Sequence, residues 1–367
     1  MLKNADMKSL KFKDFQIAAR SLGQWFERTS RVLPWRETPS PYRVWISEIM
    51  LQQTQVVTVV PYFERFLARF PTVESLAQAS EDDVLLNWAG LGYYSRARNV
   101  HATAKQVAAT GGFPASREAW LELPGVGPYT AGAISSIAYD QVEPILDGNV
   151  ERVISRVKAL DRSRGDSAYK GHLWKLSGLS VQMAAEVEVR PRVFNQALME
   201  LGAVVCTPKN PKCGICPIID ICRAHAAGTI SNFPPPKAPK KWIDVREQVV
   251  ALISENGEQV LLRKRALGEW RAGLWDFPAP DEMPGSFWPE QDSEPLGKIE
   301  SRHVVTRHKI SRRTSVVQLA KGNRKAGLPE SFAWVSIRSP EVALGSAPRK
   351  VLQLMSERWA SLSQFNA

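Results

Sequence analysis

The sequence has no long apolar stretch and few cysteines. No run of hydrophobic residues is long enough to cross a bilayer, and the segment from Met1 to Lys13 is polar and charged, without the apolar core of a signal peptide. We therefore expect no membrane association and a cytoplasmic protein, located at the nucleoid if it binds DNA. The four cysteines fall within seventeen residues, which in a reducing compartment is typical of a metal site rather than of disulfides.

Acidic residues are the minority charge. The chain has 37 Asp and Glu against 48 Lys and Arg, which gives a formal net charge of +11. Such an excess favours a polyanionic partner, with nucleic acid first, but charge alone is equally compatible with lysines that only keep a protein soluble. The length of 367 residues predicts two domains, and a hydrophobic content of 44% is sufficient for packed cores.

The apolar pattern changes along the chain. Up to residue 230, apolar residues recur at the three- and four-residue spacing of helices, as in the stripe formed by Val150, Val153 and Ile154. Residues 231–243 are rich in Pro and Lys and have almost nothing to bury, which predicts an extended linker. The sequence therefore predicts a mainly helical domain over residues 1–230, followed by this linker.

Residues 244–367 carry the signals of an α+β domain. Short apolar runs flank Asn256-Gly257, a strong hairpin signal. A last helix is predicted to begin near Ser346, with Pro348 in its first turn. Further strands are predicted at residues 315–319 and 332–335, and the buried face of the last helix is expected to comprise Val351, Leu354, Met355 and Trp359.

The cysteines follow the pattern Cys206-x6-Cys213-x2-Cys216-x5-Cys222. Four thiolates can hold a tetrahedral zinc ion or a cubane iron–sulfur cluster. Zinc sites usually come as two close pairs, and here only one pair has the CxxC spacing. The whole pattern resembles the cluster loop of the endonuclease-III-like DNA glycosylases. That resemblance implies a [4Fe–4S] cluster held by these four residues in the loop 206–222.

A glycine-rich turn, LPGVGPYTA from Leu123 to Ala131, joins two helical stretches. Its glycines permit a tight turn with bare backbone, and Pro128 suits the first turn of the next helix. The amides of such a turn form a ready site for a DNA phosphate. The turn resembles the helix-hairpin-helix of the same superfamily, which implies DNA contacts from Gly125, Val126 and Gly127.

Asp147 stands directly before a predicted helix, in PILDGNVER. Taken alone, this aspartate is best read as a helix N-cap. The superfamily, however, has an essential aspartate at this distance from the hairpin, and the whole segment matches. A carboxylate beside the sugar stabilises the oxocarbenium-like state of glycosidic cleavage. Asn149 orients this carboxylate or the sugar, or is only a turn residue.

Glu48 lies among Trp45, Ile49 and Leu51 in WISEIMLQQTQV. A carboxylate with such neighbours stays protonated to higher pH, as a general acid requires. Gln52 and Gln55 share its helical stripe if the helix is continuous. By periodicity alone, a solvent-facing glutamate on an amphipathic helix is the better reading.

This segment resembles the catalytic segment of the MutY family of adenine DNA glycosylases. LPWR at residues 33–36 and GLGYYSRARN at residues 90–99 match that family too, and the likeness is strong over residues 20–230 and weak beyond. It implies that Glu48 protonates adenine N7, that Asp147 stabilises or transiently bonds the sugar carbon, and that Tyr129 lies beside Glu48. The base must leave the duplex to be reached.

The same resemblance assigns the residues that contact DNA. For the apolar and aromatic ones, core packing is a competing explanation. The adenine pocket would comprise Trp35, Arg36, Leu51 and Val56; Gln53 and Tyr93 would wedge into the stack; Thr54 and Leu91 would face the oxidised guanine.

The second domain weakly resembles the Nudix-like (MutT-like) domain at the C-terminus of the MutY family. The REx2EExG pattern that holds magnesium in the hydrolases is missing after Phe277, so we expect recognition of oxidised guanine rather than hydrolysis. The family reads this base with a Phe-Ser-His loop, which corresponds to residues 303–310 here. An ungapped match puts Thr306 at the Ser position, whereas a shift of one residue keeps His308 as the histidine. A basic strand near phosphates, with Arg307, Lys309, Arg312 and Arg313, fits as well.

The sequence thus predicts a monomeric, monofunctional base-excision repair enzyme that removes adenine from A·8-oxoguanine or A·G pairs in double-stranded DNA. One alternative is an endonuclease-III-like glycosylase with lyase activity, whose chemistry uses a lysine at the seventh position of the hairpin motif. This chain has Tyr129 there. Another alternative is a non-catalytic iron–sulfur DNA-binding protein, and the presence of both Glu48 and Asp147 argues against it.

Tyr129 generates a first prediction. Because a phenol cannot form a Schiff base with the abasic sugar, base loss should occur without strand cleavage until alkali or heat is added. Gel analysis of the product with and without alkali measures this directly. Stoichiometric trapping of an enzyme–DNA adduct by borohydride during turnover would instead support the lyase. Weak trapping would not, because any surface lysine can react with an abasic site.

Overall fold

The computed structural model describes residues 12–161, 166–236, 239–284, 293–319 and 327–362. Of the predicted features, most of the segment Met1 to Lys13 and the side chain of Trp359 lie outside the described residues. The chain forms two compact units, one from residues 1–77 and 102–239, the other from residues 78–101 and 240–367. The border at residues 239 and 240 falls inside the predicted linker.

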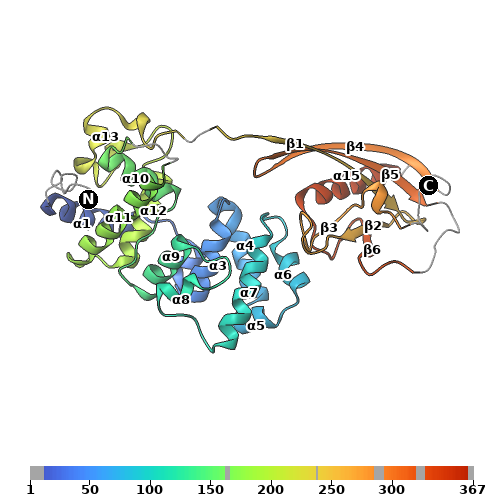
Figure 1. Cartoon of the computed structure of the whole chain (residues 1–367), viewed down its shortest axis with the longest axis horizontal. Helices are drawn as coiled ribbons and strands as arrows, with labels where there is room; N and C mark the ends of the chain where they lie inside the picture. Colours follow the sequence, from blue (N-terminus) through green and yellow to red (C-terminus); the bar gives the residue numbers. More distant parts are fainter. Residues whose placement is uncertain (1–11, 162–165, 237–238, 285–292, 320–326, 363–367) are drawn as a thin grey trace. The chain divides into compact units, whose positions relative to one another are not determined.

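The first unit is helical, as the apolar spacing predicts (Figure 1). Short 3-10 turns, η1 to η3, shape the cysteine loop and the segment after it. The elements are α1 (Phe12–Thr29), α2 (Pro34–Glu37), α3 (Pro41–Leu51), α4 (Val56–Arg69), α5 (Val73–Gln78), the end of α7 (Ser95–Ala109), α8 (Arg117–Leu121), α9 (Pro128–Tyr139), α10 (Gly148–Lys158), α11 (Ser167–Ala185), α12 (Pro191–Val204), η1 (Cys213–Ile215), η2 (Ile219–Ile221), α13 (Arg223–Ala226) and η3 (Ile230–Asn232).

Helices α9 and α10 carry the loops that hold the predicted site. The stripe of Val150, Val153 and Ile154 is buried, which fixes the rotation of α10 about its axis. In α9, Gly132 has no side chain, so the segment after the helix can pass close to the backbone of α9. A Cβ at this position would lie 2.1 Å from the carbonyl oxygen of Pro144. This contact positions the segment that leads to Asp147.

The second unit contains a mixed sheet with strand order β3-β2-β1-β5-β4, and β6 pairs with β2. Strands β1 and β5 are parallel, and the other neighbours are antiparallel. The elements are α6 (Glu81–Trp88), the start of α7, β1 (Ile243–Ile253), β2 (Gln259–Lys264), β3 (Trp275–Asp276), η4 (Pro280–Glu282), β4 (Ser293–Val305), β5 (His308–Leu319), β6 (Phe332–Ser336) and α15 (Ser346–Leu362).

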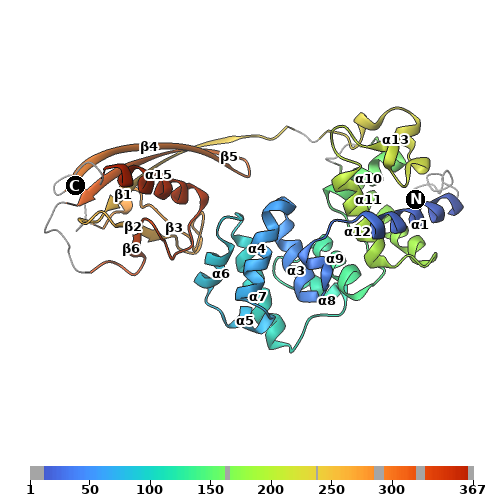
Figure 2. The same ribbon diagram turned by 180° about the vertical axis from the view of Figure 1, so that it is seen from behind.

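The α+β prediction for this part of the chain is confirmed. The Asn256-Gly257 signal lies in the connection between β1 and β2, where Gly257 has a φ of +75°. Helix α15 begins at Ser346, as predicted, and buries Val351 and Met355 in one core with strand residues such as Val316. In both ribbon views α15 runs beside the long strands β1, β4 and β5 (Figures 1 and 2).

An ion-pair network surrounds the buried side chain of Arg312 in β5. The guanidinium of Arg312 is buried and donates to both carboxylate oxygens of Asp276, at 2.6 and 2.8 Å. Glu247 and Arg271 complete the network. None of the described helices is both long and apolar enough to cross a membrane.

Gly132 gives a stability prediction. Gly132→Ala should destabilise the protein by about 1–3 kcal/mol or more, because the added methyl would overlap the backbone carbonyl of Pro144 and force it to shift. The matched control is Gly171→Ala in α11, where an added Cβ meets nothing within 4 Å. It should stabilise by up to about 1 kcal/mol through helix propensity. Urea unfolding of both variants provides the measurement, and a neutral Gly132→Ala would contradict the close approach.

Candidate active site

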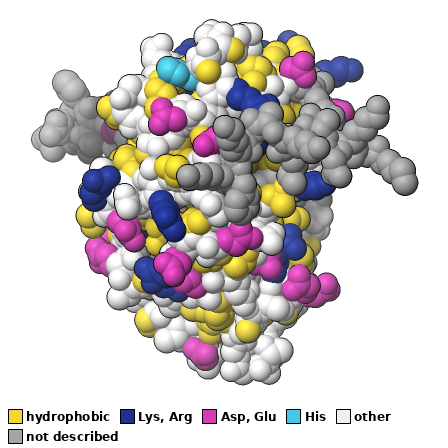
Figure 3. Space-filling model, turned by 90° about the vertical axis from the view of Figure 1, so that its left-hand side faces the viewer, with side chains coloured by type: hydrophobic (Ala, Val, Ile, Leu, Met, Phe, Trp, Pro, Cys, Tyr) yellow, Lys and Arg dark blue, Asp and Glu magenta, His cyan; other side chains and the backbone are white. Residues whose placement is uncertain are grey.

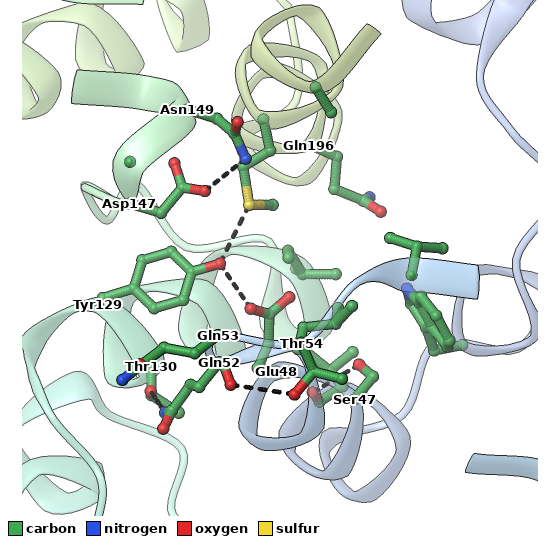
Figure 4. Close-up of a pocket in the computed structure, with 18 of the residues that line it drawn as sticks. Ser47, Glu48, Gln52, Gln53, Thr54, Tyr129, Thr130, Asp147, Asn149 and Gln196 are labelled. Carbon is green, nitrogen blue, oxygen red and sulfur yellow. Dashed lines mark hydrogen bonds between the residues drawn. The ribbon is translucent and has the colours of Figure 1, made fainter. Parts of the chain in front are cut away.

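A pocket of about 1080 Å³ opens in the first unit, between the end of α3, the turn before α9, the start of α10 and one face of α12. Most of the predicted site residues line it (Figure 4). They are Trp35, Arg36, Glu48, Leu51, Gln53, Thr54, Val56, Gly125, Gly127, Tyr129, Asp147 and Asn149. Val126 is buried at the hairpin and is not among the lining residues.

Glu48 is buried in this pocket, with 5% of its surface exposed. The solvent-facing alternative is therefore wrong, because α3 is packed on nearly all sides and buries Trp45, Ile46 and Ile49 as well. Burial raises the pKa of Glu48 to about 7; the hydrogen bond from Tyr129 and the charge of Arg36 oppose this rise, and the charge of Asp147 adds to it. A carboxyl group with this pKa holds its proton near neutral pH.

Tyr129 connects the two sides of the pocket. Its hydroxyl donates to Oε2 of Glu48 at 2.6 Å and lies 3.2 Å from the sulfur of Met199. Figure 4 shows this hydroxyl between Glu48 and the pair formed by Asp147 and Asn149. Burial first, and then the charges of both carboxylates, raises the pKa of Tyr129 well above its ordinary value, so it remains a neutral donor. The resemblance placed it beside Glu48, and that is where it lies.

Asp147 caps α10, as its position alone predicts, and it also lines the pocket. Its Oδ1 accepts from the Val150 amide at 2.7 Å, and its Oδ2 accepts from the Asn149 side chain at 2.8 Å. Burial raises the pKa of Asp147, and these two hydrogen bonds oppose that rise. Its donors therefore favour the ionised form more strongly than the single hydroxyl donor of Glu48 does.

Arg152, one turn further along α10, holds this arrangement in place. Its guanidinium donates to Asn149 Oδ1 at 2.8 Å and to the Gly202 carbonyl at 2.6 Å. Its Nε donates to the carbonyl oxygen of Cys206 at 2.7 Å. A chain of hydrogen bonds thus runs from the cysteine loop to the Asp147 carboxylate. Asn149 also fits tightly, since a Cβ at Gly202 would lie 2.5 Å from its Cβ.

Arg36 is fixed from the opposite wall by Glu200. Both Arg36 and Arg31 form ion pairs with this buried carboxylate, at 2.9 and 2.6 Å. Burial acts to raise the pKa of Glu200, and the hydrogen bonds and charges of the two arginines outweigh it, so its pKa is lowered. An ionised Glu200 therefore holds Arg36 at the edge of the pocket.

The helix that carries Glu48 is not continuous to Gln55. Helix α3 ends at Leu51, Gln53 has a φ of +58°, and Gln55 is the N-cap of α4. The condition under which Gln52 and Gln55 would share the helical stripe of Glu48 is therefore not met. The break exposes the Gln53 side chain at the pocket rim and leaves Gln52 within 3.4 Å of the Thr130 hydroxyl. A residue other than glycine with a positive φ is typical of functional loops.

Leu91 and Tyr93 lie in the loop between α6 and α7, which belongs to the second unit. Gly90, Gly92 and Tyr93 all have positive φ values there. Arg96 donates to the carbonyl oxygens of Leu91 and Gly92, both at 3.2 Å, and lies over the Tyr93 ring. Tyr93 is 38% exposed, as a residue that wedges into the base stack needs to be. Leu91 is buried and therefore also contributes to packing.

Thr306 and His308 lie together at one hairpin tip of the second unit. Thr306 and Arg307 form the turn between β4 and β5, and Val305 pairs with His308. Thr306 has a φ of +54°, and the His308 ring lies 5.3 Å from the ring of Trp270. Thr306 and His308, the two candidates for recognition of the oxidised guanine, therefore lie at the same hairpin tip. Arg312 does not belong to a phosphate-facing strand surface, because its side chain is buried against Asp276.

The four cysteines surround one small cavity of about 30 Å³ after α12. Burial first, and then the charges of the other three cysteines, raises the pKa of Cys216 to about 11. Arg156 donates to the Cys206 sulfur at 3.3 Å and to the Thr207 carbonyl at 2.8 Å. Four thiols around one cavity, with a guanidinium on one sulfur, fit a thiolate-ligated cluster.

Sequence reasoning missed several lining residues. Three come from one face of α12, where polar or polarisable side chains interrupt an apolar helix at a spacing of three and four residues, a signal that could have identified them. They are Gln196, Met199 and Glu200, and the pocket is also lined by Arg31, Ser47, Thr130, Lys170 and Trp174.

Comparison with known proteins agrees with this geometry. Residues 46–178 match the family model of the HhH-GPD superfamily base excision DNA repair proteins, and residues 206–222 match that of the iron-sulfur binding domain of endonuclease III. The chain also resembles the structure of a thermostable thymine-DNA glycosylase, with a TM-score of 0.50 and 27% identity over 59% of this chain and 98% of that one. Fold and site define a helix-hairpin-helix base-excision repair protein with a [4Fe–4S] cluster.

The curated relatives narrow this class. The chain is 43% identical to the adenine DNA glycosylase of Rattus norvegicus over 72% of this chain, and it spans 61% of that relative's length. It is 32% identical to the adenine DNA glycosylase of Schizosaccharomyces pombe over 94% of this chain and 91% of the relative. The protein belongs to the adenine DNA glycosylase family.

The pKa of Glu48 predicts a pH-dependent stability. The folded protein holds this proton up to about pH 7, whereas the ordinary value is 4.5, so the free energy of unfolding falls as pH rises from about 4.5 to about 7. Glu48→Gln removes the cost of the buried charge. It should raise the free energy of unfolding by about 3 kcal/mol at pH 8 and far less at pH 5. Urea titrations at both pH values measure this.

Glu27→Gln is the control, because Glu27 is exposed on α1. It should leave the stability at both pH values unchanged. Equal effects of Glu48→Gln at pH 5 and pH 8 would contradict the raised pKa.

The cysteine cavity predicts the colour of the protein. The purified chain should be brown, with broad absorbance near 400 nm, roughly as thiolate-ligated iron–sulfur clusters give. Cys213→Ser should lower the iron content and the folding stability together, because the cluster orders the loop. Metal analysis tests this: one equivalent of zinc without iron or sulfide would contradict it.

Proposed function

We propose that the protein is a monofunctional adenine DNA glycosylase that acts on adenine opposite 8-oxoguanine or guanine in duplex DNA. The observation that carries this proposal is the arrangement of Glu48, Tyr129 and Asp147 in one pocket, in a chain of the adenine DNA glycosylase family. The reaction requires that the adenine is flipped out of the duplex, because these buried carboxylates cannot reach a base inside it.

Glu48 acts first, as the general acid. With its pKa near 7 it holds a proton at neutral pH and donates it to N7 of the flipped adenine. Protonated adenine leaves as a neutral base when the bond between C1′ and N9 breaks, whereas the adenine anion is a poor leaving group. General acid catalysis of this kind contributes roughly 100- to 10,000-fold to the rate.

Asp147 faces the sugar as the positive charge develops. Its carboxylate, fixed by the Val150 amide and Asn149, stabilises the oxocarbenium-like state without reorganising. Water then adds to C1′ and passes a proton to the Glu48 carboxylate, which restores the acid. The products are free adenine and an abasic site. Tyr129 holds the Glu48 carboxyl group in place and offers no amine for lyase chemistry.

The test uses three duplexes that differ in one pair: A·8-oxoguanine, A·G and A·T. Abasic sites should form in the first two and not in the third, and Asp147→Asn should abolish them while the protein still binds DNA. Absence of adenine release from all three duplexes by cluster-loaded protein, or equal release from A·T, would overturn the proposal.

The hairpin tip yields a prediction about the opposite base. We infer that Thr306, His308 or both contact the oxidised guanine, so the double variant Thr306→Ala/His308→Ala should lose preference for A·8-oxoguanine over A·G by about 10-fold, the value of one lost hydrogen bond. The single variants then identify which register is correct. Ser311→Ala, further along β5, is the control. A double variant with the parent's preference would contradict this role for the tip.

A further inference from the structure

The strands β1, β5 and β4 present one exposed face over half of their length. On β5 the side chains of Ile310, Arg312 and Thr314 are buried, while Lys309 and Arg313, on alternate positions, are exposed. The strand register brings exposed partners to the same side. Ser311 of β5 pairs with Arg246 of β1 on one flank and with Arg302 of β4 on the other, and Lys309 lies between Asp244 and Val304.

We call this surface the basic sheet face and define it by Arg246, Lys298, Arg302, Lys309 and Arg313. Two acidic residues, Asp244 and Glu300, share it. Arg313 pairs with Glu300 at 3.1 Å, and both side chains are more than half exposed, so this pair contributes little. Within the described part of the chain, the other four basic residues have no ion-pair partner.

The same side of the sheet changes character along the strands. Beyond this region Val250, Leu252 and Val317 are buried in an apolar cluster with Leu261 and Met283. The three strands therefore extend beyond the part of this face that the apolar cluster covers, and their basic residues are exposed in that extension. Like charges on neighbouring strands destabilise a sheet, so folding alone does not favour this arrangement. On the face drawn in Figure 3, by contrast, basic and acidic side chains are intermixed.

An exposed aromatic ring lies at the edge of this face. Trp242, directly before β1, is 45% exposed, and the amines of Lys309 and Lys240 lie 5.2 and 5.8 Å from its ring centre. Arg307 continues the positive charge at the adjacent hairpin turn. Basic residues around an exposed aromatic ring match the chemistry of a nucleic-acid surface, where cations meet phosphates and the ring packs on sugar or base.

We propose that the basic sheet face binds the phosphate backbone of duplex DNA. The proposal rests on the proposed function only in that it supplies DNA as the polyanion. The contacts are independent of base sequence, and they add affinity rather than recognition of the mispair.

The test is the salt dependence of binding to a plain duplex with only A·T and G·C pairs, measured by fluorescence anisotropy on the full cluster-loaded chain. In Arg246→Gln/Arg302→Gln/Lys309→Gln, the slope of log K against log salt should be smaller by about 2 to 3, roughly 0.9 for each lost phosphate contact. Binding at about 0.1 M salt should be roughly 100-fold weaker.

The matched control removes three exposed basic residues elsewhere in the same unit: Arg338→Gln/Arg349→Gln/Lys350→Gln. Its slope should stay near that of the parent. Equal loss of slope in both triple variants would show that only net charge matters, and an unchanged slope in the first would show that the face binds something other than DNA; either result overturns the proposal. If the first triple variant does not fold, Arg302→Gln and Lys309→Gln singly should each lower the slope by about 0.9.

Adenine release from A·G is measured on the same preparations. A parent that binds DNA with the expected slope but releases no adenine would refute the proposed function and leave the basic sheet face intact. The reverse result, release with slopes unaffected, would refute only the face.

Discussion

The structure of the site depends on how Asp147 is held at the start of α10. One carboxylate oxygen caps the helix through Val150, and the other is fixed by Asn149. Asn149 is in turn bound by Arg152, which also binds the carbonyl oxygens of Gly202 and Cys206. The cap of α10, the carboxylate proposed to face the sugar and the first cysteine of the cluster loop thus share one hydrogen-bond chain. Removing any member would leave buried polar groups unpaired, so folding and chemistry are coupled here.

Two buried carboxyl groups in one pocket have different hydrogen-bond partners and charges around them. Glu48 has one neutral donor, Tyr129, and keeps its proton to about pH 7. Asp147 has an amide, a side-chain amide and the nearby charge of Arg152, all of which favour its charged form. Burial raises the pKa of both groups, and the stronger set of donors at Asp147 fits the proposed roles of Glu48 as the acid and Asp147 as the charge stabiliser. The ionised Glu200 on α12 then holds Arg36 on the opposite wall.

Local pattern was enough to predict the helical unit, the hairpin turn before α9, the β1–β2 hairpin and the start of α15. It could not predict burial of Glu48, because periodicity cannot reveal that α9 packs against α3 and places Tyr129 on Glu48; the resemblance supplied that residue. The break after Leu51 and the contribution of Met199 and Glu200 depend on tertiary contacts between segments far apart in sequence. Likewise, the buried position of Arg312 in a basic strand follows from Asp276, which no local pattern connects to it.

The central claim is that a buried, protonated Glu48 starts the reaction. The most direct test is the single-turnover rate of adenine release from an A·8-oxoguanine duplex as a function of pH, with enzyme in excess. The rate should be constant below about pH 7 and fall about tenfold for each pH unit above it, since Glu48 then loses its proton. Glu48→Gln should bind the duplex as the parent does and release adenine several hundredfold or more slowly. A rate that stays constant to pH 9, or a Glu48→Gln protein with near-parental release, would contradict the account.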